Sequence, residues 1–172
     1  MKVSVIIPVY NCEEFLEECI GSLLKQTFSD FEIIVVDNKS TDDTVYMVED
    51  FMKISSKISL IKLDENLKQG IARNIGVEHA KGEYIMFVDG DDKVSPEFIE
   101  KMYNKITKDE ADMTICRWAP FDNKTGKINY EHGYANFHRL PEEFWTKSFN
   151  WHDIKEEVFS QSNVPWDKIN KK

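Results

Sequence analysis

Three carboxylates gather around one glycine at the end of an apolar segment. The segment, residues 84–88, is uncharged and rich in strand-forming side chains, which indicates a strand buried on both faces. Asp89, Asp91 and Asp92 follow it directly, with Gly90 between the first two. Carboxylates held this close repel each other by about 4 kcal/mol per pair at ~4 Å and an effective dielectric near 20. A divalent cation, Mn2+ or Mg2+, would offset this repulsion and also hold phosphate groups, because both ions prefer oxygen ligands. The alternative interpretation is a solvated acidic turn.

Two other apolar segments also end in residues suited to contact a ligand. Residues 3–7 lead into Pro8, Val9 and Tyr10, and residues 31–36 lead into Asp37. The carboxyl ends of parallel strands meet at one edge of a sheet, and open α/β sheets bind their ligands there. We therefore expect these residues to lie beside the three carboxylates.

Arg73 supplies a positive charge near the start of a helix predicted from about residue 70 to residue 80. Helix N-termini and arginine side chains both favour phosphate. A carboxylate that can bind a nucleobase or ribose, carboxylates that can bind a metal ion and an arginine that can bind phosphate together predict a nucleotide-diphosphate site. The alternatives are a turn residue for Asp37 and a surface ion pair for Arg73.

The elements that must position these residues alternate along the chain. Strands are predicted at residues 3–7, 31–36, 58–63, 84–88 and 113–118. The helices between them are predicted to begin at two capping boxes, Asn11 with Glu14 and residues 40–43, and at Ser95 with Pro96. The second helix is expected to turn Met52 inward, and the third to end with Gly82 as its C-cap.

This alternation predicts an α/β fold with a Rossmann-like, doubly wound, mostly parallel sheet. The GxGxxG fingerprint and the P-loop lysine motif are both missing, which argues against a plain dinucleotide-binding domain. A small antiparallel addition is expected after about residue 118, with a turn at residues 122–127. We expect residues 1–172 to form one domain, with an aromatic-rich tail from Phe137 to Trp166 as a surface for self-association.

The composition of the 172-residue chain narrows the classes of partner. Its formal net charge is −9, without the basic stripe of a nucleic-acid-binding surface. Three cysteines without a CxxC pattern favour a reduced, cytoplasmic protein, which could act at the inner face of the membrane. No apolar segment approaches the ~20 residues that span a bilayer, so no transmembrane segment is expected.

The chain resembles the family 2 glycosyltransferases of the GT-A fold over most of residues 3–100. The segments that carry the resemblance are Val5-Ile6-Ile7-Pro8-Val9-Tyr10-Asn11, Ile33-Ile34-Val35-Val36-Asp37 with Ser40, Thr41 and Asp42, Gly70 with Ala72-Arg73-Asn74, and Gly82-Glu83-Tyr84 leading into Asp89-Gly90-Asp91-Asp92. They occur in the family's order. A later segment, Pro165-Trp166-Asp167-Lys168, is similar to the start of the family's acceptor-side portion.

The resemblance implies a nucleotide-sugar donor, most often a UDP-sugar, with Mn2+ or Mg2+ as cofactor. It implies donor contacts from Pro8, Val9, Tyr10, Asp37, Arg73, Asp89 and Gly90, and metal contacts from Asp91 and Asp89. Asp37 would accept the uracil imide N–H, and Arg73 would lie toward the diphosphate and donor sugar. In this family a carboxylate deprotonates an acceptor hydroxyl, which attacks the anomeric carbon with inversion. The implied activity is transfer of a hexosyl or N-acetylhexosaminyl group to a saccharide or lipid-linked acceptor, as in cell-surface polysaccharide synthesis.

The sequence departs from the family pattern at two places. Many relatives carry Asp-Asp-Gly-Ser where this chain has Asp37-Asn38-Lys39-Ser40. The family's catalytic base follows a segment like residues 165–168, so we expect it beyond Lys172 and the chain to be truncated on its acceptor side. Two alternatives therefore stay open: a non-catalytic nucleotide-sugar-binding module or fragment, and a nucleotidyltransferase. The latter would need an early glycine-rich phosphate loop, which residues 8–11 do not supply.

Overall fold

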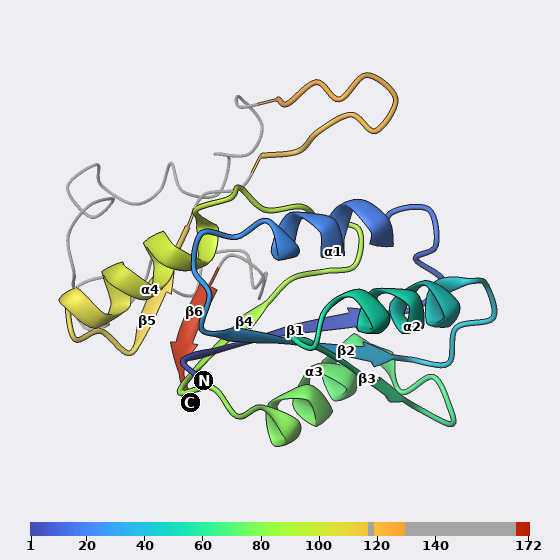
Figure 1. Cartoon of the computed structure of the whole chain (residues 1–172), viewed down its shortest axis with the longest axis horizontal. Coiled ribbons are helices and arrows are strands. Elements are labelled where there is room, and N and C mark those ends of the chain that lie inside the picture. The colour runs from blue at the N-terminus through green and yellow to red at the C-terminus, as the bar shows by residue number, and fades with distance from the viewer. Residues whose placement is uncertain (117–118, 130–167) are drawn as a thin grey trace, which may run out of the picture.

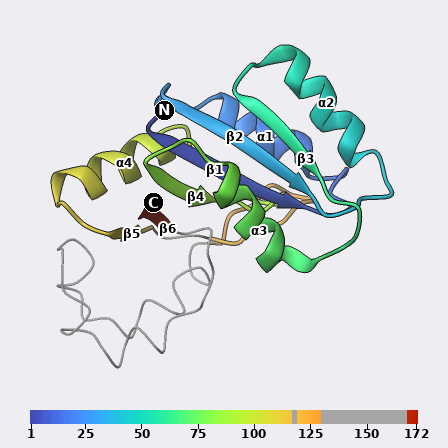
Figure 2. The same cartoon turned by 90° about the horizontal axis from the view of Figure 1, so that it is seen from below.

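The computed structural model describes residues 1–116, 119–129 and 168–172, which form a sheet with helices on both of its faces (Figures 1 and 2). The strands are β1 (Val3–Val9), β2 (Phe31–Asp37), β3 (Ile58–Lys62), β4 (Tyr84–Phe87), β5 (Met113–Ile115) and β6 (Lys168–Lys171). The helices are α1 (Leu16–Leu24), α2 (Thr44–Ile54), α3 (Lys68–His79) and α4 (Phe98–Lys108).

The strand order in the sheet is β3-β2-β1-β4-β6-β5. Strands β1 to β4 are parallel, whereas β6 lies antiparallel between β4 and β5. Residues 121 and 128 also form an antiparallel bridge, on either side of the predicted turn. The predicted fold class, a mostly parallel doubly wound sheet with a small antiparallel addition, is confirmed.

Every residue of β1 and β2 is buried, as expected for strands that lie inside the sheet and are covered on both faces. Alternate side chains of a strand point to opposite faces. Val3, Val5 and Ile7 of β1 pack with apolar residues of α1 and α4, while Ile6 packs on the other face with Ala72 of α3. Figure 2 shows α3 on the side of the sheet opposite α1 and α2.

Gly82 lies in a close contact between backbones and is not the C-cap of a helix, so that prediction is wrong. Helix α3 ends at His79, with Ala80 in an extended conformation as its cap. A Cβ atom on Gly82 would lie 2.5 Å from the backbone nitrogen of Ser4. The Gly82 N–H donates to Ser4 Oγ at 2.8 Å, and Ser4 Oγ in turn donates to Glu32 Oε1 at 2.7 Å. This buried network fixes the start of β4 against β1 and β2.

The predicted capping boxes do not form, because Asn11 and Ser40 join two loops, although Asp42 Oδ1 accepts the N–H of Thr44, the first residue of α2, at 3.1 Å. Helix α1 begins at Leu16 and α2 at Thr44, each without a side-chain hydrogen bond from its N-cap residue. Asn11, at φ 51°, accepts the Thr41 N–H on Oδ1 at 2.8 Å, and its own N–H donates to Ser40 Oγ at 3.0 Å. The loop after β1 is therefore held directly against the loop after β2.

Three further boundaries differ from the sequence prediction. Pro8 does not end β1, since Pro8 and Val9 pair with Val36 and Asp37 of β2. Helix α4 begins at Phe98, two residues after the predicted Ser95-Pro96 start. Met52 of α2 is 40% exposed and does not face inward.

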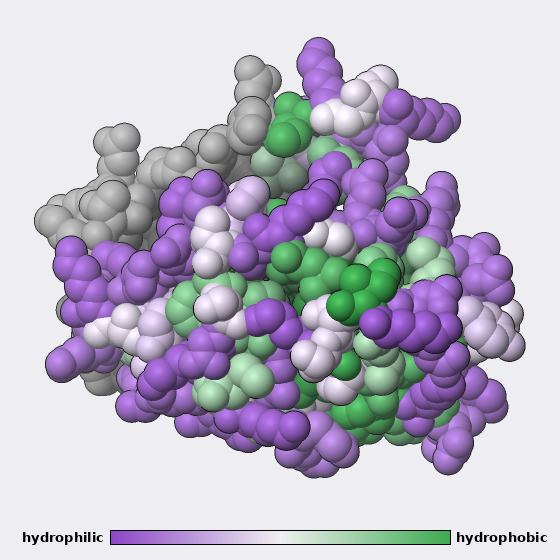
Figure 3. All heavy atoms as spheres, in the orientation of Figure 1, coloured by the Kyte–Doolittle hydropathy of each residue, from purple (hydrophilic) through white to green (hydrophobic). Residues whose placement is uncertain are grey.

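Strand β6 was not predicted, because lysine and asparagine flank its single apolar residue, Ile169, which is fully buried. The aromatic tail from Phe137 to Trp166 lies outside the described residues. The face drawn in Figure 3 is mainly hydrophilic, with smaller apolar areas between the polar ones. Within the described ranges, none of the helices has the length and apolar character needed to cross a bilayer.

Candidate functional site

The carboxyl ends of three neighbouring strands bring the predicted site residues to one edge of the sheet. Val9 at the end of β1 pairs with Asp37 at the end of β2. On the other side of β1, Ile6 pairs with Phe87, and the Val88 N–H donates to the Ile6 carbonyl at 3.1 Å. The turn after β4 therefore lies next to the end of β1, as the strand pattern predicts.

Asp89, Asp91 and Asp92 form a compact carboxylate cluster in this turn. One oxygen of each lies within 4.8 Å of the others. The Asp92 N–H donates to the Asp89 carbonyl at 3.0 Å, which closes the turn. A Cβ atom on Gly90 would lie 3.0 Å from Val9 Cγ1, so the small residue lets the turn pack against β1. Three carboxylates at this spacing supply the hard oxygen ligands that Mn2+ and Mg2+ prefer.

The cluster is electrostatically unfavourable without a cation. Burial raises the pKa of Asp92 to about 6, and the negative charges of Asp91 and then Asp89 add to the rise. Burial also raises the pKa of Asp89, while Arg73 opposes that rise by its hydrogen bond and its charge. Positive charge is therefore needed to keep these acids ionised together.

Arg73 lies against the cluster, a contact that the sequence spacing did not predict. Its guanidinium Nη2 donates to Asp89 Oδ1 at 2.7 Å, and both side chains are largely buried, at 14% and 12% exposure. The Arg73 Nε atom is buried, and no hydrogen-bond partner is found for it within the part of the chain that the structure describes. An arginine N–H aimed at no protein acceptor is suited to a ligand oxygen.

The other end of the edge contains Asp37, which is only 3% exposed. Its carboxylate accepts the Ser40 N–H, at 3.1 Å for Oδ1 and 3.2 Å for Oδ2. Asp37 therefore does stabilise the turn, which is the alternative role considered for it. Its carboxylate still has lone pairs that can accept a hydrogen bond from a ligand. Tyr10, one residue past β1, is 48% exposed.

Asn38, one of the departures from the family pattern, joins this end of the site to α3. Its Oδ1 accepts the Leu67 N–H at 2.8 Å, and its Nδ2 donates to Asn66 Oδ1 at 2.9 Å. An aspartate here would lack the N–H that Asn66 accepts. Lys39, where many relatives have glycine, adopts φ 65°, so the loop keeps a left-handed residue without glycine, at a cost of about 1–2 kcal/mol.

The sheet order and this edge define a GT-A type α/β domain, and comparison with known proteins identifies its family. The model of glycosyl transferase family 2 matches residues 4–161. The glycosyltransferase GlyA of Streptococcus pneumoniae is 31% identical over 163 residues, which cover 95% of this chain and 22% of GlyA. The poly(ribitol-phosphate) beta-N-acetylglucosaminyltransferase TarS of Staphylococcus aureus is 36% identical over 120 residues, 68% of this chain and 21% of TarS.

Solved structures of TarS share the fold. The crystal structure of TarS 1-349 in complex with UDP has a TM-score of 0.75 at 27% identity, covering 99% of this chain and 47% of that one. The complex of the same TarS segment with UDP-GlcNAc gives a TM-score of 0.74 at 28% identity, covering 99% of this chain and 45% of that one. The chain therefore belongs to glycosyl transferase family 2. It spans about a fifth of GlyA and about half of the solved TarS segment.

Proposed function

We propose that this chain binds the donor in a metal-dependent, inverting glycosyltransferase that uses a UDP-sugar. The observation that carries the proposal is the cluster of Asp89, Asp91 and Asp92 at the carboxyl edge of the sheet, with Arg73 bonded to it. Membership of glycosyl transferase family 2 and the UDP and UDP-GlcNAc complexes of TarS support the class of donor.

The base would lie at the β1–β2 end of the edge. The Asp37 carboxylate would accept the uracil imide N–H on a lone pair not used by Ser40, a charged hydrogen bond of about 1.5–3 kcal/mol. Tyr10 offers an exposed ring for stacking, and base–aromatic stacking is worth about 1–3 kcal/mol. The backbone of Pro8 and Val9 would border the base.

The diphosphate would lie between the carboxylate cluster and Arg73. Asp91 and Asp89 would hold the cation, with Asp92 nearby, and Asp89 keeps its Oδ2 atom for the cation or the ribose because Oδ1 accepts from Arg73. When bound, a divalent cation stabilises the negative charge on the diphosphate leaving group. The Arg73 Nε–H would donate to a phosphate oxygen. Gly90, whose lack of a side chain lets the turn pack against Val9, would border the donor with its backbone.

Transfer would form a bond between an acceptor oxygen and the anomeric carbon, while the bond from that carbon to the diphosphate oxygen breaks. The acceptor's hydroxyl proton would pass to a carboxylate base, which we assign to none of the described residues. The acceptor would be a saccharide or a lipid-linked saccharide, as in the synthesis of cell-surface polysaccharides. The group transferred would be a hexosyl or N-acetylhexosaminyl unit.

A thermal-shift panel tests the class of ligand. With Mn2+ present, UDP and UDP-sugars should raise the melting temperature more than GDP or ATP, and ligand at 100 times its dissociation constant should add about 2.7 kcal/mol of stability. The proposal fails if none of these nucleotides shifts the transition. Incubation of the stabilising UDP-sugar with saccharide acceptors then tests transfer, read as acceptor-dependent release of UDP. Stabilisation without that release would favour a nucleotide-sugar-binding module.

A further inference from the structure

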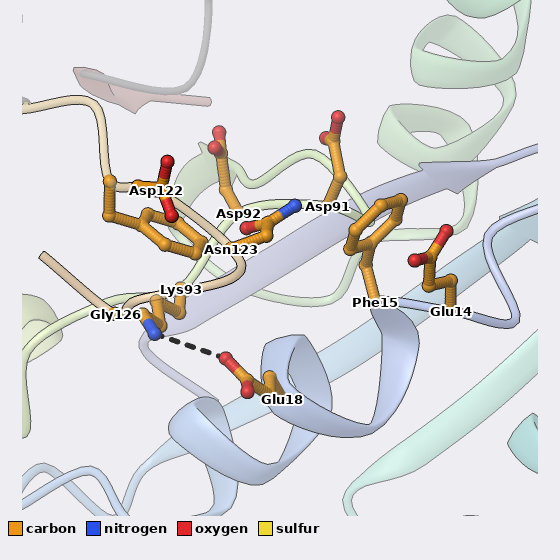
Figure 4. A pocket seen from close by; sticks show the side chains of 10 residues that line it. Glu14, Phe15, Glu18, Asp91, Asp92, Lys93, Asp122, Asn123 and Gly126 are labelled. Carbon is orange, nitrogen blue, oxygen red and sulfur yellow. Dashed lines mark hydrogen bonds and ion pairs between the residues drawn. The ribbon is translucent and has the colours of Figure 1, made fainter.

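A cavity of about 160 Å3 lies beside the carboxylate cluster and is walled by three separate segments (Figure 4). The start of α1 contributes Phe15, the turn after β4 contributes Asp91 and Asp92, and the hairpin at residues 119–129 contributes Phe121 and Asn123. The cavity does not include Asp37, Arg73 or Asp89. It therefore shares Asp91 and Asp92 with the proposed cation site but lies apart from the proposed contacts to the base and from Arg73.

Lys93, in the turn that carries the cluster, contacts the other two walls of the cavity. Its ammonium pairs with Glu18 Oε2 of α1 at 3.0 Å, the contact drawn in Figure 4. The same ammonium lies 4.1 Å from the centre of the Phe121 ring, a cation–π contact with the hairpin. Lys93, directly after the cluster, thus contacts both α1 and the hairpin.

The hairpin has its own well-formed turn, which is held by Asp122. Asp122 Oδ1 accepts the N–H groups of Lys124 and Thr125 at 3.0 and 2.8 Å, and the Gly126 N–H donates to the Asp122 carbonyl at 2.7 Å. Asp122 is therefore occupied by the turn. In contrast, no hydrogen bond is found for the side-chain amide of Asn123 within the described ranges, and Figure 4 shows that side chain extending toward Asp91 and Asp92.

This combination of groups suits a sugar ring. Aromatic side chains bury apolar surface, here available to the C–H face of a sugar, while carboxylates accept from hydroxyl groups and an amide both donates and accepts. The volume is below the ~300–1,000 Å3 of pockets for drug-sized ligands, so it suits one ring and not an oligosaccharide.

The charge of the cavity favours an uncharged ring. Among the lining residues that the structure describes, the ammonium of Lys93 faces five carboxylates, those of Glu14, Glu18, Asp91, Asp92 and Asp122. A divalent cation on the cluster would still leave the lining net negative. Phosphate or carboxylate groups on a ligand would be repelled there.

We propose that this cavity binds one uncharged sugar ring, and that Asn123 and the hairpin contribute to its selection. The proposal rests on the proposed glycosyltransferase function and names a substrate class for the same site. The ring belongs either to the donor, as the sugar attached to UDP, or to the acceptor, and the two arms of the experiment distinguish these sources.

The first arm measures dissociation constants by calorimetry with Mn2+ for UDP, UDP-glucose, UDP-N-acetylglucosamine and UDP-glucuronate. If the donor sugar occupies the cavity, the neutral UDP-sugars bind at least about fivefold more tightly than UDP-glucuronate. Asn123→Ala then weakens the neutral UDP-sugars about fivefold, for one lost hydrogen bond, and leaves UDP unchanged. Lys127→Ala, on the same exposed hairpin but outside the cavity lining, is the matched control and should change none of these values.

The second arm adds methyl glucoside, methyl N-acetylglucosaminide or glucuronate to the chain saturated with UDP and Mn2+. If the acceptor occupies the cavity, only the two neutral glycosides shift the backbone amide signals of Asn123 and Gly126, and Asn123→Ala removes the effect. The inference is overturned if neither arm distinguishes neutral from anionic sugars, or if Asn123→Ala behaves like Lys127→Ala in both. A chain that does not bind UDP at all would instead overturn the proposed function.

Discussion

At the scale of single residues, the clustered acids of the turn after β4 suit a cationic ligand but lower the stability of the folded chain. Asp92 is partly buried beside two other carboxylates, and its pKa is raised to about 6. The folded chain therefore holds a proton on Asp92 in a pH range where the unfolded chain has already lost it. Natural sites often pair such local destabilisation with binding.

Asp92→Asn should stabilise the metal-free chain at neutral pH. Because the folded pKa of Asp92 lies above its ordinary value of 3.8, the folded state binds more protons between about pH 4 and pH 6. The free energy of unfolding therefore falls as the pH rises through that window, and the full destabilisation by Asp92 is present above about pH 6. After allowance for partial solvent exposure, we expect the variant to be about 1 kcal/mol more stable at pH 7 and nearly equal to wild type at pH 4.

Urea denaturation without divalent ions, at pH 4 and pH 7, measures this difference. Asp64→Asn, at an exposed acid outside the cluster, is the control and should change stability little at either pH. A lower stability of Asp92→Asn than of wild type at pH 7 would show that Asp92 is not under electrostatic strain.

Asp37→Ala should weaken UDP binding about ten- to a hundredfold at constant Mn2+, because one charged hydrogen bond to the base is lost. The variant also loses the acceptor for the Ser40 N–H, so its folding is checked by circular dichroism and urea denaturation. Calorimetry gives the dissociation constants. Unchanged UDP affinity in a folded variant would show that Asp37 stabilises the turn but does not bind the base.

At the scale of elements, loops and close backbone contacts fix the edge of the sheet. Side chains of residues 11 and 40 join the loops after β1 and β2, and Asn38 joins β2 to the start of α3. Gly82 brings the start of β4 against β1. The site residues are therefore placed by contacts between elements distant in sequence.

Gly82→Ala should destabilise the chain by about 2–3 kcal/mol, because the new Cβ would lie 2.5 Å from the backbone nitrogen of Ser4, which cannot move aside easily. Gly21→Ala is the matched control. It lies within α1, and a Cβ atom added there would meet nothing within 4 Å, so we expect it to stabilise by about 0.5–1 kcal/mol. Thermal or urea unfolding compares the two. Equal effects of both substitutions would contradict the close backbone contact.

The sequence predicted the strands better than the contacts between them. The mostly apolar segment 31–36 identifies the buried strand β2 directly, since period and composition are local properties. Asn11 with Glu14 satisfies a local capping rule, yet Asn11 bonds to Thr41, because nothing local reveals that a second loop lies within reach. The pair of Arg73 with Asp89 and the strand β6 likewise depend on tertiary packing, which residue spacing alone does not encode.

At the scale of the whole molecule, the parallel sheet gathers residues from distant parts of the chain at one edge. With a net charge of −9, the chain carries an overall field that repels a nucleotide diphosphate. Arg73 is already paired with Asp89, so it does not offset the cluster alone. The central claim is therefore that a divalent cation must lie between the carboxylate cluster and the diphosphate for UDP to bind tightly.

Calorimetric titration of UDP in Mn2+ and in chelator tests this claim most directly, with wild type, Asp91→Asn and the exposed control Glu65→Gln. We expect wild type and Glu65→Gln to bind UDP at least about tenfold more tightly in Mn2+, a difference of ~1.4 kcal/mol. Asp91→Asn should lose most of that difference while its affinity in chelator stays near that of wild type. Equal affinity of the wild-type chain for UDP in Mn2+ and in chelator would contradict the account.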